Sequence, residues 1–63
     1  MKKKILIISG GISKERLISL DTGQQVANEL TKHGYIVKIT EPDNNLEKNI
    51  KFFSPNVIFN ALH

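Results

Sequence analysis

The sequence has 63 residues, with nine Lys or Arg, six Asp or Glu, a formal net charge of +3 and no cysteine. A chain of about 60 residues buries only about 60% of its unfolded surface, and without cysteine no disulfide can compensate. The run Lys2-Lys3-Lys4 is too short for a nucleic-acid-binding patch, so we expect no binding to nucleic acid. No apolar stretch reaches the length of a signal peptide or a membrane span, so we expect a cytoplasmic protein that does not bind membranes.

A first strand is predicted over residues 5–8, where Ile5-Leu6-Ile7-Ile8 is apolar without alternation. Continuous apolar character is typical of a strand that is covered on both faces, as in a parallel sheet. Gly10 and Gly11 follow at once, and glycine permits a tight turn with positive φ and a close approach of backbone to a ligand. The pattern predicts a buried strand that ends in a tight turn.

A helix is expected next, with Ser13 as its N-cap, Glu15 in its first turn and Gly34 as its C-cap. Gly23 lies in the middle of its apolar stripe and predicts an unusually close approach of helix and strand. The residues of this stripe, which should face the sheet, are Leu20, Gly23, Val26, Ala27 and Leu30.

Two aliphatic residues of this helix, Leu17 and Ile18, fall outside the apolar stripe and lie beside the glycine turn. They are either incidental surface residues, which are common, or they face something absent from this chain. We favour the second interpretation because ligands gather at glycine-rich strand ends.

The remaining residues complete a β-α-β-α-β order. Residues 35–40 alternate in polarity, which indicates a strand nearer the edge, and residues 46–53 form a short helix that ends before Pro55. Residues 57–62 form a third strand that leads to His63. Right-handed crossovers predict an α/β fold, a three-layer Rossmann-like unit with a parallel sheet in the order 2-1-3. Because the third strand lacks any continuation, we expect a fragment of a larger domain, inactive and marginally stable alone.

The glycine turn lacks the spacings of known phosphate loops. It contains neither Gly-x-Gly-x-x-Gly nor Gly-Lys-Ser/Thr, and Glu15 at the helix mouth would repel a phosphate. An ammonium group is the more natural guest for Glu15, although the carboxylate can also simply complement the helix dipole. His33 and His63 are too far apart in sequence to suggest a metal site.

Three further polar residues are candidates for a role near this turn. Ser19 is expected to donate its hydroxyl hydrogen to the carbonyl four residues earlier. His63, at the carboxyl end of a strand, is a candidate site residue. Arg16 either pairs with an acid on an absent domain or is solvated along its length.

The residues of the turn and of the last strand together resemble the amino-terminal region of D-alanine–D-alanine ligases. That family's pattern reads Gly-Gly-x-Ser-x-Glu-Arg-x-Val-Ser-Leu, with a later strand that ends in Asn-Ala-Leu-His-Gly. Here residues 10–20 read Gly-Gly-Ile-Ser-Lys-Glu-Arg-Leu-Ile-Ser-Leu and residues 59–63 read Phe-Asn-Ala-Leu-His, with Gly23 and Gly34-Tyr35 between them. The chain departs from the pattern at Leu17, where many members have an acid, and at Ile18, which replaces valine.

The resemblance implies a three-domain ATP-grasp enzyme, of which residues 1–63 are the front of the first, pre-ATP-grasp domain. Such enzymes use ATP to phosphorylate the carboxylate of one D-alanine, and the amine of a second D-alanine then displaces phosphate, in peptidoglycan precursor synthesis. ATP and magnesium lie on the other domains, so this segment binds neither and holds no metal. The implied partners are D-alanine and the remaining domains of the same polypeptide, and a homodimer is left open.

The resemblance also implies roles for particular residues. Glu15 would hold the substrate ammonium and Ile18 would form an apolar wall near the substrate methyl. Ser19 would support the same helix turn within the subsite, and His63 would lie beside the reacting D-alanine. With Gly10 and Gly11 these residues form the floor of the first D-alanine subsite, and Glu15 and His63 are the candidate catalytic residues.

Two alternatives remain open on the sequence. One is another ATP-grasp ligase with the same first domain. The other is an α/β module without catalysis, whose glycine turn binds an anion or a nucleotide.

Overall fold

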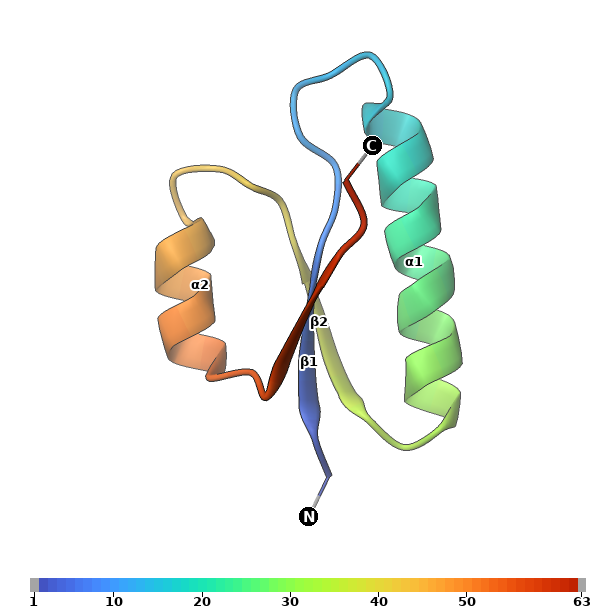
Figure 1. Cartoon of the computed structure of the whole chain (residues 1–63), viewed down its shortest axis with the longest axis vertical. Coiled ribbons are helices and arrows are strands. Elements are labelled where there is room, and N and C mark those ends of the chain that lie inside the picture. Colours follow the sequence, from blue (N-terminus) through green and yellow to red (C-terminus); the bar gives the residue numbers. More distant parts are fainter. Residues whose placement is uncertain (1, 63) are drawn as a thin grey trace.

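The computed structural model describes residues 2–62, which form three strands and two helices in alternation (Figure 1). In chain order the elements are β1 (Lys4–Ile8), α1 (Arg16–Lys32), β2 (Ile36–Thr40), α2 (Leu46–Phe53) and β3 (Val57–Asn60). The β-α-β-α-β order predicted from the sequence is therefore confirmed.

The three strands form one parallel sheet in the order β2-β1-β3, as predicted. Ile5 of β1 lies opposite Val37 on one side and Val57 on the other. The Cα atoms extend only 10 Å along the shortest axis of the molecule, which is the width of three strands at about 4.8 Å spacing. Figure 1 looks down this axis, so the strands overlap in the centre of the view.

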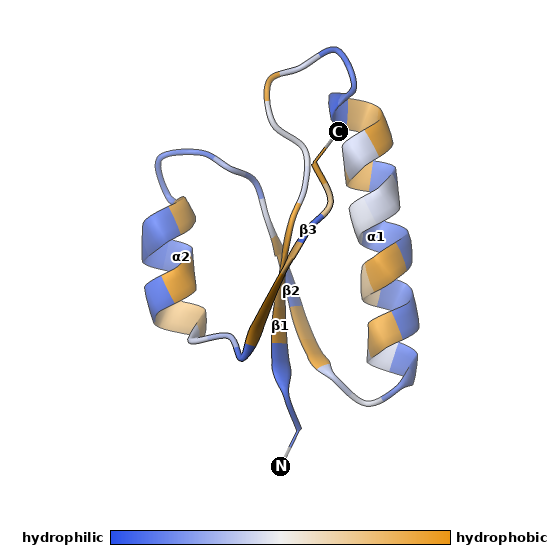
Figure 2. Ribbon diagram, in the orientation of Figure 1, coloured by the Kyte–Doolittle hydropathy of each residue, from blue (hydrophilic) through white to orange (hydrophobic). Residues whose placement is uncertain are grey.

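The two helices cover opposite faces of the sheet (Figure 1). The chain passes from β1 to one neighbour through α1, and from there across β1 to the other neighbour through α2, so right-handed crossovers put the helices on opposite sides. Ile5, Ile7, Ala27 and Ala61 form the core on the α1 side. Leu6, which alternation turns to the other face, is also fully buried. Figure 2 shows this pattern as apolar strands between two helices whose outer faces are largely polar.

Gly23 lets α1 approach β1 closely, as the sequence predicted. A Cβ atom at Gly23 would lie 2.7 Å from both Cβ and Oγ of Ser9, the residue that follows β1. Side chains do not pack at that distance, so position 23 has room for glycine alone. The small side chain of Ser9 is fully buried in the same contact.

The predicted start of α1 is wrong by a few residues. The helix begins at Arg16, and Glu15 takes the N-cap position instead of a place in the first turn. Ser13 does not cap the helix: its Oγ accepts a hydrogen bond of 3.2 Å from the backbone N–H of Glu15, within the turn that precedes the helix. At the other end, Gly34 follows the C-cap residue His33 with a φ of +89°.

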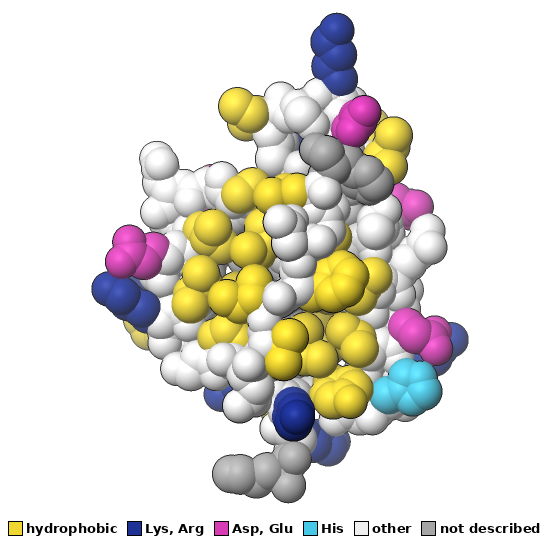
Figure 3. Space-filling view, viewed as in Figure 1, with side chains coloured by type: hydrophobic (Ala, Val, Ile, Leu, Met, Phe, Trp, Pro, Cys, Tyr) yellow, Lys and Arg dark blue, Asp and Glu magenta, His cyan; other side chains and the backbone are white. Residues whose placement is uncertain are grey.

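Strand β3 leaves its apolar side chains half exposed. Val57, Ile58 and Phe59 are each more than two fifths exposed, and within residues 2–62 no strand pairs with the outer edge of β3. Figure 3, which has the same viewpoint as Figure 1, shows hydrophobic side chains gathered over the centre of the surface on the β3 side. Neither helix within the described range has the length and apolarity needed to cross a membrane.

Candidate functional site

The carboxyl ends of the three strands meet beside the glycine turn. The backbone N–H of Ser9 donates to the carbonyl of Thr40 at 3.0 Å, and the N–H of Ala61 donates to the carbonyl of Ile8 at 2.8 Å. Gly10 and Gly11 then take φ values of +91° and +94°, which residues with a side chain rarely adopt. This backbone conformation turns the chain from β1 toward α1 and brings the start of α1 to the ends of the strands.

Ser19 joins the first helix to both the turn and β3. Its hydroxyl accepts a hydrogen bond from the N–H of Gly10 and donates one to the carbonyl of Ala61, each at 2.8 Å. The expected bond from this hydroxyl to the carbonyl of Glu15 is therefore wrong; only the backbone N–H of Ser19 bonds to that carbonyl. Ser19 is 1% exposed, so its side chain holds the local structure together and does not face solvent.

Glu41 joins the end of β2 to the turn and to α1. Its Oε1 accepts hydrogen bonds from the N–H of Gly11 at 3.2 Å and from Nε of Arg16 at 3.0 Å. Its Oε2 accepts a further bond from Nη2 of Arg16 at 2.8 Å. Arg16 thus forms a bidentate pair within this chain, which corrects both sequence interpretations of its side chain.

The pKa values of this pair shift in opposite directions. The hydrogen bonds from Arg16, together with the N–H of Gly11, hold the pKa of Glu41 below its ordinary value. The hydrogen bonds to Glu41, and the charge of that carboxylate, raise the pKa of Arg16. Both groups are therefore charged throughout the neutral range.

Glu15 and Ile18 lie at the exposed start of α1. Glu15 is exposed, and no cationic side chain of residues 2–62 forms an ion pair with it. Ile18 is 56% exposed and Leu17 is 76% exposed, as expected for residues outside the buried stripe. An uncompensated carboxylate and two aliphatic side chains therefore share one helix end.

A shallow hollow of about 220 Å³ lies over the turn. It is lined by Gly10, Gly11, Ile12, Ser13, Pro42 and Leu62. The structure thus brings the predicted glycines together with the residues that follow β2 and β3. Glu15 and Ile18 are not among the lining residues, and the predicted His63 lies outside the described residues.

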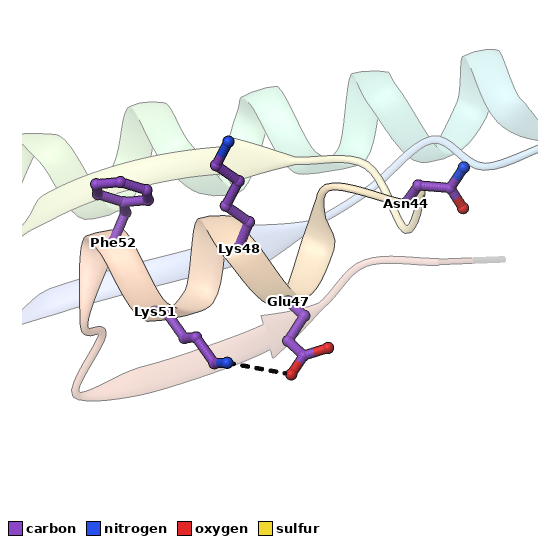
Figure 4. Close-up of a pocket in the computed structure, with 5 residues that line it drawn as sticks. All are labelled: Asn44, Glu47, Lys48, Lys51 and Phe52. Atoms are coloured by element: carbon purple, nitrogen blue, oxygen red, sulfur yellow. Dashed lines mark ion pairs between the residues drawn. The ribbon is translucent and has the colours of Figure 1, made fainter.

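A second hollow, of about 350 Å³, lies far from the turn on the outer surface of α2. Figure 4 shows its five lining residues as sticks, with Lys51 paired to Glu47 at 3.4 Å. Glu47 and Lys51 point toward each other on one side of the helix, whereas Lys48 and Phe52 point to the other side, so the five side chains do not converge on a shared point. This arrangement indicates an open helix surface and no site.

The described residues offer little to a metal or a phosphate. Within residues 2–62 no three His, Cys, Asp or Glu side chains are grouped as metal ligands would be. Both backbone N–H groups of the glycine turn already donate to side-chain oxygens, those of Ser19 and Glu41. An anion bound by the N–H groups of Gly10 or Gly11 would have to displace an internal hydrogen bond.

Sequence reasoning missed Glu41. The signal was present, because Glu41 directly follows a strand next to β1 in a parallel sheet, and residues at the carboxyl ends of neighbouring parallel strands meet at one edge. Arg16 is a cation close to the same edge, so an ion pair between Arg16 and Glu41 could have been predicted.

Comparison with known proteins gives a consistent result. No family model matches the chain. A D-alanine--D-alanine ligase of Pelagibacter ubique is 76% identical over 63 residues, which are 100% of this chain and 21% of the relative. Enzymes of the same name from Zymomonas mobilis and Moorella thermoacetica are 39% and 42% identical over 98% and 95% of the chain, and each is covered over 19% of its length. The chain thus spans about a fifth of these relatives, and the resemblance seen in the sequence is confirmed for that segment.

Proposed function

We propose that this chain, similar throughout its length to one segment of D-alanine–D-alanine ligases, is the front of the first domain of such an enzyme. The whole enzyme is ATP-dependent, joins two D-alanines for a peptidoglycan precursor, and works in the cytoplasm. The observation that carries the proposal is the 76% identity over the entire chain with a relative of that name. The arrangement of charges around the glycine turn supports it independently.

The contacts of Gly10, Gly11 and Arg16 disfavour an anionic guest at the turn. Its two N–H groups are bonded to Ser19 and Glu41, so they are not free to cradle a phosphate as the backbone of a phosphate loop does. Arg16, a cation at the start of α1, is already engaged by Glu41 through two hydrogen bonds. These contacts argue against the alternative of an anion-binding or nucleotide-binding module.

Glu15 is the residue to which we assign the substrate ammonium. Its carboxylate is exposed and has no cationic partner among residues 2–62. A fixed anion is needed to hold an ammonium group in a site closed to water, because an unpaired buried charge is strongly disfavoured. Ile18, also exposed at the start of α1, would provide the apolar wall next to the methyl group of D-alanine.

The other predicted residues have different places in this proposal. Ser19 supports the subsite without facing it, because its buried hydroxyl is already bonded to the N–H of Gly10 and to the carbonyl of Ala61. Gly10 and Gly11 form the floor of the hollow. His63 would lie beside the reacting D-alanine, and it retains that role as an expectation from the resemblance.

The proposed reaction has two steps. An oxygen of the first D-alanine's carboxylate takes the terminal phosphoryl group of ATP, which yields ADP and an acyl phosphate. The amine of the second D-alanine then attacks the acyl carbon, and the tetrahedral intermediate expels phosphate as the amine loses a proton. This segment's part is to bind and orient the first D-alanine. We place ATP and magnesium on the remaining domains, since the described residues do not fit either.

A chimera tests the proposal directly. In it, this chain replaces the matching 63-residue segment of the Pelagibacter ubique relative; we refer to it as the chimeric ligase. We expect D-alanine-dependent release of ADP and phosphate, with formation of the dipeptide, and calorimetric binding of D-alanine. If the chimeric ligase is folded but forms only dipeptides from other amino acids, the chain belongs to another ATP-grasp ligase. If it binds simple nucleotides through this segment, the anion-binding alternative holds.

A further inference from the structure

A single carboxylate, that of Glu41, connects three parts of the chain that are distant in sequence. Glu41 directly follows β2, and it accepts hydrogen bonds from Gly11 in the glycine turn and from Arg16 at the first position of α1. The two bonds to Arg16 are 2.8 and 3.0 Å long and reach both carboxylate oxygens. Such a bidentate geometry fixes the orientation of the Arg16 guanidinium relative to the Glu41 carboxylate as well as the distance between them.

The glycine turn is shaped around this carboxylate. A Cβ atom at Gly10 would lie 2.5 Å from Oε1 of Glu41 and 2.9 Å from its carboxyl carbon. Gly10 is therefore needed for the space that Glu41 occupies, in addition to its positive φ. Gly11 in turn supplies the N–H that the same oxygen accepts.

The pair lies next to the residues of the proposed subsite. Arg16 follows Glu15 directly, and Ile18 comes two residues later in the same first turn of α1. Glu15 has no side-chain capping bond that would hold the start of the helix. The bonds to Glu41 are thus the side-chain contacts that tie the first residue of α1 to the sheet.

From these contacts we infer that Glu41 is a positioning residue for the first D-alanine subsite, which it builds by fixing the glycine turn and the start of α1 together. The inference rests on the proposed function. Glu41 does not touch the substrate in this account. It sets where the Glu15 carboxylate and the Ile18 side chain stand relative to the floor of the hollow.

The test is Glu41→Gln in the chimeric ligase. The amide keeps the shape of the side chain and one acceptor oxygen, but its NH2 group takes the place of the other oxygen and cannot accept a hydrogen bond from Arg16, so the bidentate pair is lost. A shift of about 1 Å in a binding group can cost up to about 100-fold in rate, and we expect the KM for the first D-alanine to rise on the order of 10-fold to 100-fold. The KM for ATP should stay within about twofold, because the nucleotide lies on other domains.

Glu47→Gln is the matched control. It removes another exposed ion pair, the one between Glu47 and Lys51 at 3.4 Å on α2, which lies far from the turn. Amide hydrogen exchange adds a readout that does not depend on activity. Glu41→Gln should speed exchange in residues 10–20 while residues 46–53 stay as in the wild type, and Glu47→Gln should leave residues 10–20 unchanged.

The outcomes separate this inference from the proposed function. If the wild-type chimeric ligase is active but Glu41→Gln has the D-alanine KM of Glu47→Gln, Glu41 has no positioning role and the proposed function stands. An equal rise of both KM values would also overturn the inference, since it indicates general damage. If the wild-type chimeric ligase is folded but inactive, the proposed function fails, and unchanged exchange in residues 10–20 would then reject the structural part of the inference as well.

Discussion

Replacing Ser19 by alanine should destabilise this segment far more than the loss of one hydroxyl suggests. The substitution leaves the N–H of Gly10 and the carbonyl of Ala61 without their partner, both in buried residues. A buried polar group without a partner costs about 1–3 kcal/mol, whereas the better helix propensity of alanine returns about 0.5 kcal/mol. We expect the free energy of unfolding of the segment to fall by about 2 kcal/mol, measured by hydrogen exchange of residues 2–62 in the chimeric ligase.

Thr31→Ala provides the matched control for this measurement. Thr31 lies on the same helix, and its hydroxyl donates to the carbonyl of Ala27 at 2.7 Å, four residues earlier. That carbonyl belongs to the helix and keeps its backbone environment, so the substitution should change the free energy by no more than about 0.5 kcal/mol. Equal effects of Ser19→Ala and Thr31→Ala would refute the view that Ser19 holds the turn, α1 and β3 together.

Three further predictions concern the packing, the charges and the completeness of this segment. Gly23→Ala should destabilise it by about 1–3 kcal/mol through overpacking against Ser9, and an unchanged or raised stability in hydrogen exchange would contradict the close approach. Because the pKa of Glu41 is lower in the folded state, its pair with Arg16 stabilises the fold above the ordinary carboxyl pKa, and this contribution disappears as the pH falls through the lowered value. The free energies of unfolding of wild type and Glu41→Gln should therefore become equal only in acid. Equal values already near neutral pH would contradict this predicted pH dependence. The isolated chain should be marginally stable because β3 is half exposed, and a cooperative thermal transition above about 60 °C would show that it is a complete domain.

The layout of the sheet was predictable because it depends on patterns within single elements. The unbroken apolar run of residues 5–8 indicated a central strand, and the alternation in residues 35–40 indicated an edge strand. With right-handed crossovers, these two observations are enough for the order β2-β1-β3. The close approach at Gly23 was predictable for a similar reason, since a glycine within a buried helix stripe presents bare backbone to the strand that it faces.

The contacts at the site were less predictable because they join residues far apart in sequence. Ser19 bonds to a carbonyl 42 positions away, and a local rule for serine in helices named the carbonyl four residues earlier instead. Arg16 and Glu41 are 25 positions apart, so only the sheet order brings them together. The start of α1 was misplaced because the turn after Gly11 uses the Ser13 hydroxyl for itself.

The central claim is that Glu15 holds the ammonium group of D-alanine, and Glu15→Gln in the chimeric ligase tests it most directly. The amide keeps the shape of the side chain and removes its charge. We therefore expect kcat/KM for the first D-alanine to fall roughly 30- to 5,000-fold, which corresponds to a loss of about 2–5 kcal/mol of transition-state stabilisation, and the KM for ATP to change little. Glu29→Gln, which alters a largely exposed glutamate near the other end of α1, should leave the kinetics unchanged. If Glu15 only complements the helix dipole, Glu15→Gln will lose about 0.3–1 kcal/mol of stability and keep wild-type kcat/KM. That result would contradict the account.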